Sequence, residues 1–227
     1  MTDAKRFLEN DIKALVLEKL KARRILIPGD CVISEFTVDN HTRRTDLLLV
    51  RRKDIWAVEI KSEFDSLVRL EEQIKTYSSF FDKVIVVCAQ KHTSSVLNIS
   101  PMNIEVWELN QQNHIRIVRR GKIAKVVDKQ NLLRLFKVSE LRKLAREIGT
   151  YAPSATKRQL LSILSRAPLV MIRNTIIDGI RSRYKLTSMH FWENTKNTAV
   201  STETIKLLSK NTNKKIVQVD CDMPKWL

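Results

Sequence analysis

Two residues of opposite charge end an apolar stretch of the chain, the run WAVEIKSEF at residues 56–64. In an extended strand the side chains of Glu59 and Lys61 share one face, whereas those of Trp56 and Val58 share the other. The apolar face is typical of a strand that packs on a core. The charged face suits either an ordinary exposed ion pair or a chemical site.

A second carboxylate favours the chemical site. Asp46 lies 13 residues before Glu59, in another strand-like run. If the two runs pair as a hairpin, Asp46 lies beside Glu59 on the same face. Their carboxylates and the backbone carbonyl of Ile60 are hard oxygen ligands of the kind that Mg²⁺ or Mn²⁺ prefers. Such a metal acidifies a bound water and offsets charge on a phosphate, and Lys61 is placed to hold either of these groups.

The pattern Thr45-Asp46 … Glu59-x-Lys61 resembles the motif of the PD-(D/E)xK nuclease superfamily, with threonine in place of the proline. The order of the predicted elements is also similar to the core of that superfamily. The resemblance covers about residues 4–109. It implies a restriction-endonuclease-like core and a deoxyribonuclease that uses Mg²⁺ or Mn²⁺.

A further match lies on the predicted helix after the Glu59 strand. Gln73 and Tyr77 form a QxxxY pattern similar to that of RecB-like and Cas4-like nucleases. Arg69 precedes Gln73 by four residues, so the three side chains form one polar stripe on a helix. The resemblance implies that Gln73 and Tyr77 flank the site, and that they position metal ligands or the DNA strand.

Other charged residues are candidates for supporting roles. Glu35 lies on the strand before Asp46, and nucleases of the similar type often supply a further acid from the first helix or strand. A solvated glutamate is the alternative for Glu35, while Glu9 and Glu18 compete for the same metal-ligand role. Arg43 and Arg44 are either phosphate contacts or residues of a solvated turn, and Arg69 is a further candidate for binding nucleic acid.

The hydrophobic periodicity predicts an α/β fold, a mixed sheet flanked by helices. The run KVIVVCA at 83–89 is typical of a buried parallel strand. We expect strands over residues 31–38, 44–50, 54–60, 83–89, 103–109 and 114–120. We expect helices from a cap at Thr2 or Asp3 through Ala22, from Phe64 to Phe81, and briefly over 92–98.

The net positive charge of the chain lies entirely in its second half. Residues 114–227 contain 24 Lys or Arg and 8 Asp or Glu, which accounts for the whole net charge of +16. This asymmetry favours a surface that binds the phosphate backbone of nucleic acid. The alternatives are a surface that keeps the protein in solution, or one that contacts anionic lipid or an acidic partner protein. We therefore expect a catalytic domain over residues 1–127 and a basic, mainly helical DNA-binding domain over 128–227, with RNA left open as a partner.

Within the second domain, residues 136–166 resemble a SAP-like helix-extension-helix motif. A plain packed helical hairpin is the alternative. Further helices are expected over 131–136 and 168–183, followed from Tyr184 by a polar tail with a helix near 202–210 and a strand at 214–219. The resemblance implies that four basic residues of the motif contact DNA: Arg142, Lys143, Lys157 and Arg158.

Three functions stay open on this evidence. The first is a metal-dependent nuclease, the second a DNA-binding protein that kept the fold but does not cut, and the third a homodimeric nuclease of branched junctions. No apolar run is long enough to span a membrane. The three scattered cysteines and the absence of an export signal favour a reducing cytoplasm.

Overall fold

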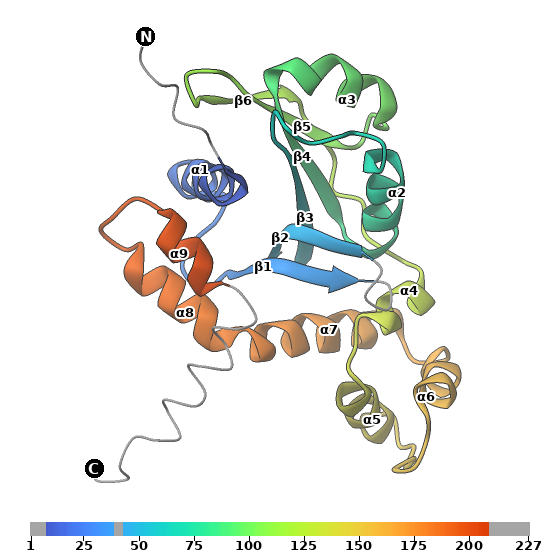
Figure 1. The fold of residues 1–227 in the computed structure, drawn as a ribbon. Coiled ribbons are helices and arrows are strands. Elements are labelled where there is room, and N and C mark those ends of the chain that lie inside the picture. Colours follow the sequence, from blue (N-terminus) through green and yellow to red (C-terminus); the bar gives the residue numbers. More distant parts are fainter. Residues whose placement is uncertain (1–7, 39–42, 209–227) are drawn as a thin grey trace, which may run out of the picture.

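The computed structural model describes residues 8–38 and 43–208. Its centre is a single six-stranded sheet in which the strands neighbour one another in chain order (Figure 1). The first three strands form an antiparallel meander, the fourth and fifth run parallel to the third, and the sixth returns antiparallel. The strands are β1 (Cys31–Val38), β2 (Arg43–Arg51), β3 (Asp54–Lys61), β4 (Lys83–Ala89), β5 (Glu105–Leu109) and β6 (Ile115–Arg119).

Helices cover both faces of this sheet, so the predicted α/β class is confirmed (Figure 1). One face carries α1, α8 and α9, while α2 and α3 lie on the other face. No helix in the part of the chain that the structure describes is long and apolar enough to cross a membrane. The helices are α1 (Glu9–Ala22), α2 (Leu70–Phe80), η2 (Gln90–His92), α3 (Thr93–Ile99), α4 (Lys129–Arg134), α5 (Val138–Glu147), α6 (Lys157–Leu164), α7 (Leu169–Arg183), α8 (Lys185–Asn194) and α9 (Thr202–Leu207).

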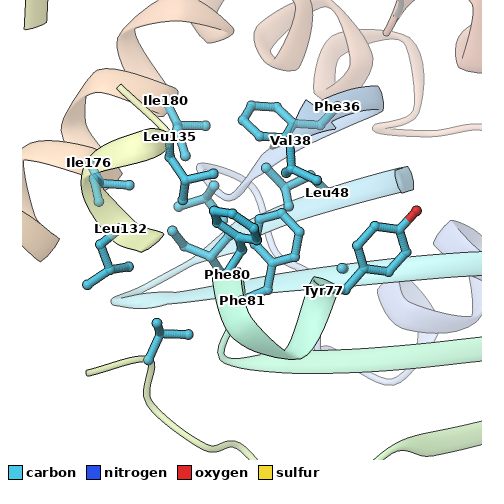
Figure 2. Packing of buried hydrophobic residues seen from close by; sticks show 14 of the residues in the cluster. Phe36, Val38, Leu48, Tyr77, Phe80, Phe81, Leu132, Leu135, Ile176 and Ile180 are labelled. Carbon is cyan, nitrogen blue, oxygen red and sulfur yellow. The ribbon is translucent and has the colours of Figure 1, made fainter. Parts of the chain in front are cut away.

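The larger hydrophobic core joins the two halves of the chain. Phe36 of β1 and Phe80 of α2 belong to the same buried cluster as Leu132 of α4 and Ile176 of α7 (Figure 2). Because α4 and α7 follow residue 127, the second half contributes directly to the core of the sheet. The domain boundary at 127/128 stays a prediction, but the halves share buried surface.

Asp82, immediately before β4, links these layers by polar contacts. Its carboxylate accepts hydrogen bonds from the backbone N–H groups of Ile55 at 2.9 Å and Val126 at 3.0 Å. The guanidinium of Arg173 in α7 also donates to it, at 2.7 Å. The carboxylate is nearly fully buried, and a buried charge is tolerated only when it is paired and hydrogen-bonded in this way.

The helix predicted from Phe64 to Phe81 is shorter than expected. Helix α2 begins only at Leu70, so the prediction is wrong for residues 64–69. The side chain of Asp65 accepts hydrogen bonds from the backbone N–H and the hydroxyl of Ser62. Such local side-chain bonds compete with the helical pattern, and they hold this segment as a turn instead.

The prediction of a weakly patterned tail directly after Tyr184 is wrong, because α8 lies there. The helix predicted near 202–210 is confirmed by α9. The hydroxyl of Ser188 accepts from the backbone N–H of Val32 at 3.2 Å and donates to the carbonyl of the same residue. Helix α8 therefore provides hydrogen-bond partners for backbone groups on the outer edge of β1. Helical periodicity in the sequence does not predict this contact. The cap predicted at Thr2 or Asp3 and the strand at 214–219 lie outside the described residues.

Candidate active site

The two carboxylates of the predicted site lie opposite each other on adjacent strands. Leu47 of β2 pairs with Val58 of β3, and this antiparallel register places Asp46 across from Glu59 on the same face of the sheet. At this end of the hairpin the Asp46 carboxylate accepts the backbone N–H of Ile60 at 2.6 Å. The Asp46 side chain thus replaces a backbone carbonyl as the hydrogen-bond acceptor of Ile60, at the point where the backbone pairing of β2 with β3 ends.

Glu59 is the centre of a hydrogen-bonded cluster. One carboxylate oxygen accepts from the amine of Lys61 at 2.9 Å and from the amide of Gln73 at 2.5 Å. The other accepts from the hydroxyl of Tyr77 at 3.1 Å. Glu59 is 3% exposed and Lys61 is 8% exposed, so the pair is held away from bulk water.

Helix α2 supplies the other wall of the site. Gln73 and Tyr77 are one turn apart on the helix, and therefore point to the same side. The amide oxygen of Gln73 accepts from Lys61 at 3.0 Å, so this residue bridges both members of the Glu59–Lys61 pair. The Tyr77 ring lies at the border of the core with its hydroxyl directed away from Phe80 and Phe81 (Figure 2).

The environment disfavours the ionised form of both acids. Burial raises the pKa of Asp46 well above its ordinary value, and the negative charge of Glu59 raises it further. Burial also raises the pKa of Glu59, although the neighbouring Lys61 opposes this effect. The pKa of Tyr77 is raised chiefly by burial and then by the Glu59 charge. Burial is therefore the main reason that ionised groups are disfavoured at this point.

A second ionic cluster lies where α1 meets β1. The amine of Lys13 is fully buried and contacts the Glu9 carboxylate at 2.5 Å, the Ser34 hydroxyl at 3.2 Å and the Glu35 carboxylate at 3.7 Å. The charges of Glu9 and Lys13 both act on the pKa of Asp46, so this cluster adjoins the site. Our sequence analysis missed Lys13, although its spacing of four from Glu9 is a detectable helical pair.

The predicted supporting residues fall in different places. Glu35 has a left-handed backbone, with φ of 61°, and its carboxylate also contacts the guanidinium of Arg44 at 3.0 Å. The backbone carbonyl of Arg44 accepts from the Tyr77 hydroxyl at 2.8 Å. Glu18 instead accepts from the backbone N–H of Val200, beside α9.

Two further arginines lie around α2. Arg43 contacts the carboxylate of Glu72 at 2.5 Å, so its charge is already partnered within the protein. Arg69 is exposed at the N-cap position of α2, one turn before Gln73.

The four basic residues predicted to contact DNA within residues 136–166 are distributed over α5 and α6. Lys143 and Arg158 are exposed. Lys157 opens α6, which is capped by the hydroxyl of Thr156. Arg142 donates to the backbone carbonyl of Ala155 at 3.4 Å, so its guanidinium ties the connection between the two helices to α5.

The donor set at the hairpin end fits a divalent cation. Asp46, Glu59 and the carbonyl of Ile60 would supply hard oxygen ligands. Burial is the main reason that the pKa of each acid is raised, and a bound cation would favour the ionised carboxylates. Among the described residues no three His, Cys, Asp or Glu side chains gather as a ready-made metal site. Water and phosphate oxygens would therefore complete the shell, as is usual for Mg²⁺.

Fold and site together define an α/β protein with two facing carboxylates and a buried amine at the end of a β-hairpin. The family model for bacteriophage P4 protein cII matches residues 2–209. The chain is also 33% identical over 207 residues to protein cII of Enterobacteria phage P4, which covers 89% of this chain and 78% of that protein. The chain therefore belongs to the phage P4 cII family.

Two solved structures show weaker likeness. The SPO1766 protein of unknown function from Silicibacter pomeroyi is 17% identical, with a TM-score of 0.41 over 63% of this chain and 94% of that one. The protein of unknown function AF1548 is 10% identical, with a TM-score of 0.28 over 77% of this chain and 98% of that one. Both likenesses are too weak to bear on fold or function.

Proposed function

We propose that this chain is a metal-dependent nuclease that hydrolyses DNA phosphodiester bonds, built on a restriction-endonuclease-like core of the PD-(D/E)xK type. One observation carries the proposal. The carboxylates of Asp46 and Glu59 face each other across the β2–β3 hairpin, and the amine of Lys61 is bonded to Glu59 at 2.9 Å. An ordinary exposed ion pair would not be buried or surrounded by Gln73 and Tyr77.

Each residue has a defined part in this proposal. Asp46, Glu59 and the carbonyl of Ile60 would hold Mg²⁺ or Mn²⁺, which when bound supplies an acidified water and neutralises phosphate charge. Lys61 would release Glu59 and donate to the attacking water or to a phosphate oxygen. Gln73 and Tyr77 fix the Glu59 carboxylate in orientation.

The second half of the chain supports DNA as the substrate. Its excess positive charge would attract the phosphate backbone without reading sequence. Exposed Lys143 and Arg158 are candidate phosphate contacts on α5 and α6. The charged residues thus divide into a compact cluster for chemistry and a broader surface for binding.

A cleavage assay tests the proposal. Purified protein is incubated with labelled single-stranded and duplex DNA in Mg²⁺, Mn²⁺ or EDTA. We expect cleavage that requires the metal and falls at least about 100-fold in Lys61→Ala, while DNA binding is retained. Lys83→Ala is the matched control. Lys83 of β4 forms a similarly buried ion pair with Glu105 of β5 at 2.7 Å, but it lies outside the site.

The same assay separates the other two functions. Binding without cleavage in every metal would contradict the nuclease and favour a DNA-binding protein on this fold. Preferential cutting of a four-way junction over a linear duplex, with a dimer mass in solution, would favour a junction-resolving homodimer.

A further inference from the structure

A lysine amine is buried where α1 meets β1, beside the candidate site. The side chain of Lys13 is fully buried, and its ammonium contacts the carboxylates of Glu9 at 2.5 Å and Glu35 at 3.7 Å. It also donates to the hydroxyl of Ser34 at 3.2 Å. A charged amine leaves water only at a cost unless it is paired, and here two acids and a hydroxyl are its partners. The ammonium is therefore held in one place between two elements.

The strand pairing places this amine close to Asp46. Ser34 of β1 pairs with Leu47 of β2 in an antiparallel register. The next residues along the two strands, Glu35 and Asp46, therefore occupy facing positions. A partner of the Lys13 ammonium thus stands across from a proposed metal ligand.

Glu35 is held by cations of the protein itself. Its φ of 61° is costly for a residue with a side chain. The alternation of β1 is interrupted there, because Ile33 and Phe36 both belong to the larger core cluster although they are three residues apart. The Glu35 carboxylate contacts Arg44 at 3.0 Å as well as Lys13. This acid is therefore already paired with two positive charges.

The charges around the hairpin end suit one divalent ion. Ion pairs and facing strand positions join four acids to three basic groups, which leaves a single negative charge when all seven are ionised. One divalent ion would change this to a single positive charge, which attracts a phosphate. A second would raise it to three, and like charges repel strongly where burial excludes water. The acids are Glu9, Glu35, Asp46 and Glu59, and the basic groups are Lys13, Arg44 and Lys61.

Many nucleases hold two divalent ions about 3.5–4 Å apart. We infer that the ammonium of Lys13 serves this chain as a built-in second cation. It engages the carboxylates of Glu9 and Glu35, which a second metal ion would otherwise need. The candidate site at Asp46 and Glu59 therefore binds one divalent ion per chain, and Lys13 is a positioning residue that acts through its two acids. The inference rests on the proposed function and adds the number of metal ions to it.

Counting bound Mn²⁺ tests the inference without relying on cleavage. The electron paramagnetic resonance signal of free Mn²⁺ is followed while the full chain is titrated at neutral pH without DNA. We expect the wild-type protein to bind one Mn²⁺ per chain. Lys13→Met keeps the apolar stem but removes the ammonium, and should bind two. Adding Glu9→Gln to Lys13→Met should return the count to one, because the additional ion then loses a carboxylate.

Lys83→Met is the matched control. The amine of Lys83 is similarly buried, but within the described part of the chain it pairs with one acid only, Glu105 at 2.7 Å. Its removal should leave the count at one Mn²⁺. A purely structural role predicts the same outcome for Lys13→Met. An unchanged count in Lys13→Met, or two ions on the wild-type protein, would therefore overturn the inference.

Glu9→Gln in the otherwise wild-type chain keeps the test decisive if Lys13→Met does not fold. Half of the Glu9 side chain is exposed, and Lys13 retains Ser34 and Glu35 as partners. We expect the Mn²⁺ dissociation constant to rise by less than about 5-fold, the effect of an exposed charge. A rise above about 10-fold would identify Glu9 as a metal ligand and count against the inference.

The two proposals fail in different ways. If the wild-type protein cleaves DNA but binds two Mn²⁺, the role of Lys13 is wrong and the nuclease stands. If the count rises from one to two in Lys13→Met but no metal supports cleavage, the role of Lys13 stands on a protein that does not cut.

Discussion

Glu59 is the residue around which the hydrogen bonds of the candidate site are arranged. Three side chains donate to its two oxygens, from Lys61, Gln73 and Tyr77. Asp46 lacks comparable side-chain donors among the hydrogen bonds of the described residues, and it accepts from the backbone of Ile60. Hydrogen-bond donors therefore stabilise the ionised form of Glu59 more than that of Asp46. Of the two carboxylates, Asp46 is the one whose negative charge the protein stabilises less.

This inequality predicts that Asp46→Asn stabilises the metal-free protein. The pKa of Asp46 is raised above 3.8 by burial and by Glu59, so the folded state holds its proton more tightly than the unfolded state. The resulting stability is present below pH 3.8 and is lost as the pH rises through the raised pKa. At neutral pH in EDTA we expect the free energy of unfolding of Asp46→Asn to exceed that of the wild-type protein by about 1 kcal/mol. Denaturant titration of both proteins measures this difference.

The same variant should respond oppositely to metal. Mn²⁺ should raise the melting temperature of the wild-type protein, because a ligand that binds only the folded state stabilises it. Asp46→Asn should lose most of that rise, and its advantage in EDTA should vanish near pH 3.8. A variant less stable than wild type at neutral pH in EDTA would contradict the electrostatic account.

At the scale of elements, the sequence pattern correctly predicted those features that depend on residues close together in the chain. The bounds of β1 and β4 are confirmed, since alternation or a β-branched run defines each strand. The facing of Asp46 and Glu59 also followed from sequence, because hairpin pairing fixes the register. The start of α2 did not, since Ser62 and Asp65 override an apolar spacing that runs on through Leu67.

Elements that depend on distant partners were harder to predict. Helix α8 buries Thr187, Ser188 and Phe191, and two of these are hydroxyl residues that show no apolar stripe. Their burial follows from contact with β1, which lies about 150 residues earlier in the chain. Lys13 is similar, since its full burial depends on acids and a hydroxyl from two elements.

The helical pair α5 and α6 carries a prediction of its own. Lys143→Ala and Arg158→Ala should each weaken DNA binding to a similar degree for every sequence and lower the slope of log affinity against log salt by about 1. Lys53→Ala, an exposed lysine in the β2–β3 turn of the neutral half, is the control. Titrations at several salt concentrations measure the slopes, and equal effects of all three variants would count against this surface.

At the scale of the whole molecule, the basic half is also part of the scaffold. Helices α4 and α7 complete the core against β1 and α2 (Figure 2), so the residues proposed to hold DNA are attached to the element that positions Gln73 and Tyr77. A strand gripped by the helical half would therefore meet the candidate site in a fixed orientation rather than through a loose tether.

The buried ion pair between Arg173 and Asp82 tests this coupling. Arg173→Ala leaves the Asp82 carboxylate buried without its charged partner at 2.7 Å, and should lower the free energy of unfolding by about 3–5 kcal/mol. Lys143→Ala removes an exposed partner 3.9 Å from Glu147 and should change the free energy of unfolding by at most about 0.5 kcal/mol.

Because the halves share one core, far-ultraviolet circular dichroism and tryptophan fluorescence should report a single coincident transition for both variants. Separate transitions would instead assign the two halves to independent folding units.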